Sequence, residues 1–128
     1  MPEHPETAEP ELEVVRVYLR DFVLPVRIGV FSHEKTRAQD VRFDVTVEVD
    51  VPRGGPRRLE DILSYDRIRE IVSATVAERH IDLAERLAQT IACRVLSEPR
   101  ARRISVEVEK LEMGPGRVGV EIVMTRPA

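Results

Sequence analysis

The sequence predicts an α+β domain, in which a four-stranded antiparallel sheet carries two helices on one face in the order β-β-α-α-β-β. Two observations predict this architecture. Apolar and polar residues alternate over 13–30, 41–49, 104–109 and 118–124, as they do in half-buried strands. Helical periodicity is confined to the stretch between the second and third of these segments, so the strands are grouped instead of alternating with helices.

The first strand changes phase in its middle. Val15, Val17 and Leu19 share one face, but after Asp21 the apolar face continues from Phe22. A slip of one residue predicts a β-bulge near Asp21. Pro25 cannot donate to a sheet ladder, which predicts an edge position for this strand. A polar loop and the strand 41–49 complete a long antiparallel hairpin.

Two helices follow a connection rich in Gly, Pro and Arg at 51–60. Ser64 is the expected N-cap of a helix that begins at Tyr65. Asp82 is the expected N-cap of the second helix, with Glu85 reaching back from the third helical position as in a capping box. His80 lies between the helices and is a candidate to cap the end of the first one.

The second hairpin contains the most informative break in pattern. Ile104, Val106 and Val108 form the apolar face of its first strand, and Lys110 follows in the same phase. A turn at 113–116 leads into the strand 118–124. Either the strand ends before Lys110 and the ammonium reaches water, or the lysine enters a cleft where its pKa suits proton transfer.

Three other residues leave two interpretations open. Glu85 is either a helix cap or a carboxylate that accepts two parallel N–H bonds from a ligand. Tyr65 is either an aromatic lid over the first helical turn or a phenol that donates a proton. Glu34 lies in a polar loop, where plain solvation is the simpler interpretation.

Composition excludes several classes of protein. The 128 residues suit one domain, expected at 13–128 after a disordered acidic tail at 1–12. A net charge of −3 and the absence of Trp argue against nucleic-acid binding. One Cys and three unclustered His predict neither disulfide nor metal site. With no apolar run of ~20 residues and no signal peptide, we expect a cytoplasmic protein without membrane contact.

Four motifs in register resemble the dihydroneopterin aldolase family, over residues 16–125. LRDFVLPVRIGVFSHEKTRAQD is similar to the family's first strand and G-V-x-x-x-E loop, with a Gln five residues later. DILSYDRI resembles its D-x-x-x-Y helix start, IDLAERLAQTIA its N-L-x-E-x-L-A segment, and VEVEK the strand that ends in an active-site lysine. The matching residues are Gly29, Glu34, Gln39, Tyr65, Glu85 and Lys110.

The resemblance implies a tunnelling fold (T-fold), in which four protomers pair their sheets into a barrel and two barrels often stack as an octamer. It therefore implies a homo-oligomer, tetramer or octamer, with active sites between protomers. Barrel closure suits a chain whose sheet would otherwise leave two open edges.

The resemblance also implies a reaction without a cofactor. 7,8-Dihydroneopterin would undergo retro-aldol cleavage to 6-hydroxymethyl-7,8-dihydropterin and glycolaldehyde, a step of folate biosynthesis, with the protonated imine at N5 as electron sink. Glu85 would bind the 2-amino group and N3–H of the pterin, and Lys110 would act as acid and base. Glu34 would pair with Lys110. Tyr65 would protonate the enamine from another protomer. Backbone groups of Leu63, Leu83 and Ala84 would complete the pterin contacts.

Departures from the family pattern leave alternatives open. Ser64 replaces a common His, Ala84 replaces a common Leu, and LEMGPGRVG follows Lys110 where many members have Pro. One alternative is dihydroneopterin triphosphate 2'-epimerase, which shares the same residues. Its triphosphate would need basic groups, for which Arg37, Arg42 and Arg117 are candidates. A second alternative is a non-catalytic pterin or purine binder.

Overall fold

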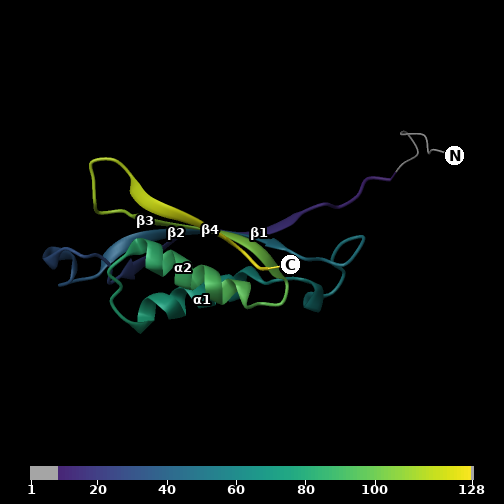
Figure 1. Cartoon of the computed structure of the whole chain (residues 1–128), viewed down its shortest axis with the longest axis horizontal. Coiled ribbons are helices and arrows are strands. Elements are labelled where there is room, and N and C mark those ends of the chain that lie inside the picture. Colours follow the sequence, from purple (N-terminus) through teal and green to yellow (C-terminus); the bar gives the residue numbers. More distant parts are fainter. Residues whose placement is uncertain (1–8, 128) are drawn as a thin grey trace.

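A four-stranded antiparallel sheet in the order β1-β2-β3-β4 covers two helices, as the sequence predicts. The computed structural model describes residues 9–127. Figure 1 shows the sheet above and both helices beneath it, so one face of the sheet is covered. The elements are β1 Val15–Val26, β2 Gln39–Val49, α1 Tyr65–Glu78, α2 Ala84–Leu96, β3 Ala101–Lys110 and β4 Val118–Thr125, with short 3-10 helices at Ser32–Glu34 and Leu59–Asp61.

The core lies between the sheet and the helices. Alternate residues of β2, from Val41 to Val49, are buried, and Phe43 is the largest side chain in this set that is fully enclosed. β3 contributes Ile104, Val106 and Val108 in the same way. α1 packs against β1, and α2 packs against β3 and β4. The period-2 and period-3.6 apolar patterns therefore meet at a single interface.

β1 has the predicted irregularity and the predicted edge position. Its register against β2 shifts between Leu19 and Phe22, and Asp21 adopts φ +56°. The backbone N–H of Asp21 donates to the Asp44 carboxylate at 2.9 Å, which holds the bulge. β1 pairs only with β2 within the described chain, so Pro25 interrupts no second ladder. The strand ends at Val26, four residues before the predicted end, where the chain turns toward Gly29.

The two helix starts differ in how well they were predicted. Ser64 caps α1 as expected, because its hydroxyl accepts the N–H of Asp66 at 3.1 Å. The predicted cap of α2 is wrong: its N-cap is Leu83, without a side-chain cap bond. Asp82 instead points back to His80, with 3.3 Å between Oδ1 and Nε2. His80 does not cap α1 either, since it binds the carbonyl of Gly29.

The predicted tail at 1–12 falls mostly outside the described residues. Residues 9–12 are exposed and belong to no helix or strand. Within 9–127, no helix is long and apolar enough to cross a membrane. The residues that position the candidate site all lie in or beside the sheet and its two helices.

Candidate active site

The loop after β1 brings a carboxylate into the interior. Gly29 has φ +125°, a conformation that L side chains rarely adopt. A Cβ at this position would lie 2.2 Å from Cδ of Glu34, so the missing side chain also provides the space for the carboxylate. The 3-10 turn at Ser32–Glu34 then carries Glu34 back toward the sheet. A glycine is therefore required here for two independent reasons.

Glu34 is buried and fully engaged. Its side chain accepts hydrogen bonds from Lys110 Nζ at 2.9 Å, Gln39 Nε2 at 3.1 Å and the Phe31 N–H at 3.3 Å. Only 3% of the residue is exposed, so the solvated loop position considered from sequence is wrong. The Lys110 ammonium, more than any other group, lowers the pKa of Glu34 from 4.5 to about 2. Glu34 is therefore a stable carboxylate anion.

Lys110 belongs to β3 and does not lie beyond it. It pairs with Val41 as the last residue of the strand, on the face that carries Val106 and Val108. Its side chain is 18% exposed and forms an ion pair with Glu34. Of the two sequence interpretations, the structure shows the lysine in a cleft. The ammonium is held by its partner, yet it keeps one open side toward a cavity.

The cavity beside Lys110 has a volume of about 230 Å³. Its lining combines the loop after β1, the start of α2 and the ends of β3 and β4: Val30, Phe31, Glu34, Asp82, Leu83, Ala84, Glu85, Lys110, Met113, Val118, Gly119 and Val120. Five of the seven predicted site residues are thereby brought together. These are Glu34, Leu83, Ala84, Glu85 and Lys110.

Glu85 stands at the entrance of α2 with its carboxylate free. It is exposed and takes part in none of the hydrogen bonds or ion pairs between described residues. The N–H groups of Ala84 and Glu85, the first two of α2, have no intrahelical acceptor, and no N-cap side chain binds them. Ala84 and Glu85 both line the cavity beside Lys110, so a carboxylate and two N–H groups lie at its wall, which suits a flat ligand with both donors and acceptors.

The other two predicted residues, Leu63 and Tyr65, lie at the opposite end of the helix layer. Arg67 near the start of α1 pairs with Glu98 after the end of α2, at 3.4 Å, so the start of α1 is far from the start of α2. Leu63 is buried beside a separate cavity of about 530 Å³. Tyr65 is 58% exposed. Within one protomer, neither residue joins the cavity beside Lys110.

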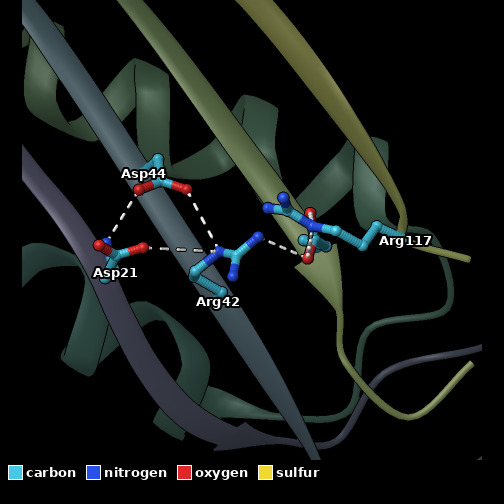
Figure 2. A network of polar contacts seen from close by, with 5 residues as sticks. Asp21, Arg42, Asp44 and Arg117 are labelled. Atoms are coloured by element: carbon cyan, nitrogen blue, oxygen red, sulfur yellow. Dashed lines mark hydrogen bonds and ion pairs between the residues drawn. The ribbon is translucent and has the colours of Figure 1, made fainter.

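The three arginines considered for a phosphate tail are all paired. Arg37 binds Glu112 at 2.9 Å. Arg42 and Arg117 bind Glu109 at 2.5 and 3.0 Å. Figure 2 shows Arg42 and Arg117 in front of the sheet with the helices behind it, on the face away from the core. None of the three lines the cavity beside Lys110.

Gln39 is a site residue that sequence reasoning matched to a motif without giving it a role. Its amide donates to both Glu34 and the carbonyl of Ile28, the latter at 3.1 Å, so it fixes the loop and the carboxylate together. The sequence did contain an indication of this role, because Gln39 lies in the same alternation as Val41 and Phe43, on the buried face of β2. A polar residue in an apolar phase needs internal partners.

Comparison with known proteins agrees with the fold. The chain has the T-fold, and the family model for dihydroneopterin aldolase matches residues 17–123. The chain therefore belongs to the dihydroneopterin aldolase family.

Three relatives illustrate the range of this family. Dihydroneopterin triphosphate 2'-epimerase of Pseudomonas aeruginosa is 31% identical over 79% of this chain and 85% of its own. The Burkholderia thailendensis dihydroneopterin aldolase bound to guanine is 28% identical, with TM-score 0.74, over 89% of this chain and 93% of its own. The E. coli dihydroneopterin aldolase in complex with neopterin is 25% identical, with TM-score 0.75, over 86% and 98%.

Proposed function

We propose that this protein is a dihydroneopterin aldolase. The observation that carries the proposal is the buried Glu34–Lys110 ion pair on the wall of the cavity that Glu85 also lines. One carboxylate is available to hold the pterin, and one ammonium is held ready beside it to move protons. Two relatives crystallised with guanine and with neopterin support a ligand of this class.

Glu85 anchors the pterin in this proposal. Its free carboxylate accepts the N3–H and the 2-amino group as a charge-assisted bidentate pair. The N–H groups of Ala84 and Glu85 and the backbone of Leu83 complete the contacts on this side. The apolar residues Val30, Val118 and Val120 in the lining leave room for the flat faces of the ring.

Lys110 and Glu34 carry the proton transfers. The C1'–C2' bond breaks as the 2'-hydroxyl loses its proton, and the electron pair flows into the protonated C6=N5 imine to give an enamine and glycolaldehyde. Protonation of C1' then yields the hydroxymethyl product. Lys110 exchanges protons with N5 and the side-chain hydroxyl, and Glu34 keeps the ammonium in place. The charge of Glu34 persists throughout because its pKa is held at about 2.

A second protomer completes the site. The cavity of about 230 Å³ in one protomer is smaller than the roughly 300–1,000 Å³ usual for ligand pockets. Tyr65 is exposed at the far end of the helix layer, where it can serve a neighbouring copy, and Leu63 lines the separate cavity of about 530 Å³ at the same end. The outer strands β1 and β4 each have one edge unpaired in the described protomer, which favours a barrel-forming homo-oligomer. In the assembly, Tyr65 protonates the enamine.

Charge favours a substrate without phosphates. Glu34, Asp82 and Glu85 line the cavity against the single cation Lys110. A triphosphate would meet this excess of carboxylates. Arg42 and Arg117 pair with Glu109 on the outer face of the sheet, and Arg37, which lines a neighbouring small pocket with Glu34, pairs with Glu112. Triphosphate 2'-epimerase is the second candidate, because the Pseudomonas aeruginosa relative carries that name. After C1'–C2' cleavage of the triphosphate, the released two-carbon aldehyde keeps the triphosphate, and re-addition of the enamine carbon C1' to the opposite face of its carbonyl would give this product.

Product analysis separates the two functions. The protein is incubated with dihydroneopterin and, separately, with its triphosphate. Release of glycolaldehyde from dihydroneopterin supports the aldolase. Inversion at C2' of the triphosphate without release supports the epimerase. If neither substrate reacts while guanine binds, the protein is a pterin or purine binder and the catalytic proposal is wrong.

Two variants test the assigned roles. Lys110→Ala should abolish turnover while guanine still binds, and Lys35→Ala, the other lysine of the chain, is the control. Glu85→Ala should lose guanine affinity, and Gln89→Ala, one turn further along α2 and outside the cavity lining, is its control. Full activity in Lys110→Ala would contradict the mechanism. Unchanged guanine affinity in Glu85→Ala would contradict the anchor.

A further inference from the structure

The linker between the helices is clamped to the loop after β1. The N–H of Gly29 donates to the carbonyl of Ile81 at 3.0 Å, and the N–H of Ile81 donates to the carbonyl of Arg27 at 2.9 Å. Ile28 and Ile81 form a parallel β-bridge between these two segments. Residues 27–29 and 80–82 therefore lie side by side, although about 50 positions separate them in the sequence.

His80 adds the only side-chain bond described across this clamp. Its Nε2 lies 2.9 Å from the carbonyl oxygen of Gly29, so Nε2 carries the hydrogen, since a carbonyl only accepts. The side chain is 20% exposed, and its buried Nδ1 has no partner among the described residues. Asp82 Oδ1 lies 3.3 Å from the same Nε2.

The clamp connects the two halves of the candidate site. On one side, Gly29 touches the Glu34 carboxyl so closely that a Cβ would overlap it, and Glu34 holds Lys110. On the other side, the linker runs directly into Leu83 and Glu85 at the start of α2. Both the N–H and the C=O of Gly29 are fixed by the linker. The position of Gly29 therefore sets the distance between the proton-transfer pair and the pterin anchor.

We propose that His80 is a positioning residue that aligns the Glu34–Lys110 pair with a pterin held by Glu85. This inference rests on the proposed function, because the alignment matters only if both ends serve one reaction. A displacement of about 1 Å in a catalytic constellation costs on the order of 10²-fold in rate. Loss of the His80 bond should therefore reduce kcat and leave the binding of the pterin itself nearly unchanged.

Three substitutions separate position from polarity. His80→Ala removes the donor. His80→Gln places an amide NH2 at the position of Nε2, whereas His80→Asn places one at the position of Nδ1, out of reach of Gly29. Arg79→Ala, an exposed neighbour with no ion pair among the described residues, is the control. Each variant is assayed for kcat and KM with dihydroneopterin and for guanine Kd, and its fold is checked by thermal unfolding.

We expect kcat to fall 10- to 100-fold in His80→Ala and His80→Asn, on the basis of the positional sensitivity above, with guanine Kd within about threefold of the parent. His80→Gln should restore kcat to within about threefold. A kcat unchanged in His80→Ala, or equal in the Gln and Asn variants, overturns the proposal. Equal losses of kcat and guanine affinity overturn it as well, because they indicate general loosening.

Hydrogen exchange provides a readout that does not depend on turnover. The N–H of Phe31 donates to Glu34, so it reports on the loop. Its exchange should accelerate in His80→Ala and return to the parent rate in His80→Gln. If the parent protein turns over neither substrate but Phe31 exchange is faster in His80→Ala and parental in His80→Gln, the proposed function is wrong and the role of His80 in fixing the loop is supported. If the parent is active and Phe31 exchange is the same in all variants, the clamp fails and the function remains.

Discussion

Replacing Glu34 by Gln tests the charge of the buried pair. The substitution keeps the size of the side chain and one hydrogen-bond acceptor, but it removes the negative charge that faces Lys110. Lys110 is then left with its ammonium largely enclosed and without a counter-ion, which is costly. We expect Glu34→Gln to be less stable than the parent at pH 7 and equally stable near pH 2.

The size of the effect follows from the pKa. Folding lowers the pKa of Glu34 from 4.5 to about 2, and at roughly 1.36 kcal/mol per pH unit this corresponds to about 3 kcal/mol. Because the folded state binds this proton less tightly than the unfolded state, the stabilisation is complete above about pH 4.5. It is lost as the pH falls toward 2. The free energy of unfolding of the parent should therefore fall more steeply in this window than that of Glu34→Gln.

Urea unfolding at a series of pH values between 6 and 2.5 measures this difference, with the protein concentration fixed because assembly adds to stability. The two curves should converge by about 3 kcal/mol on acidification. Glu70→Gln is the control, since Glu70 pairs with Arg67 at the surface and its curve should stay close to that of the parent. Parallel curves for the parent and Glu34→Gln would refute the inference that the pair is strongly coupled.

Three further substitutions probe the frame of the site. Gly29→Ala should lower kcat at least tenfold and cost about 1–3 kcal/mol of stability, because the φ of +125° strains any L side chain and the new Cβ displaces Glu34. Gly119→Ala should cost about 1–3 kcal/mol in urea unfolding, because its Cβ would lie 2.4 Å from the carbonyl oxygen of Val108, which is backbone and yields little. Phe43→Ala should cost about 3–5 kcal/mol, since the ring is fully buried between sheet and helices. Losses under about 0.5 kcal/mol at any of the three positions would contradict the packing described.

Local patterns were sufficient where one property decides the outcome. The phase slip at Asp21 predicted the bulge, because side chains in a strand alternate and an extra residue must reverse the faces. Ser64 predicted the start of α1, because its hydroxyl needs only an N–H two residues away. Lys110 was recognised as unusual for the same reason, since the apolar phase of β3 leads to it.

Local patterns failed where a distant partner competes. The pattern at Asp82 and Glu85 fits a capping box, yet Asp82 turns to His80 and α2 starts without a side-chain cap. From the pattern of its loop, Glu34 looked solvated. Its hydrogen-bond donors, Lys110 and Gln39, lie on β3 and β2, and nothing within the loop itself indicates them. In both cases a contact between remote segments outweighs the local preference.

The sequence by itself determined the order of the elements, the faces of the strands and helices, and the set of residues that could carry chemistry, because all of these depend on spacing along the chain. The family resemblance implied that Glu34 pairs with Lys110 in the same site as Glu85, but only the tertiary structure shows the pair at 2.9 Å, Glu85 on the same cavity, and Tyr65 at the other end of the helix layer. The physical reason is that an ion pair between residues 34 and 110 leaves no trace in either local pattern. The pair forms only when the antiparallel pairing of β2 with β3 and the turn at Gly29 bring the loop after β1 next to the end of β3.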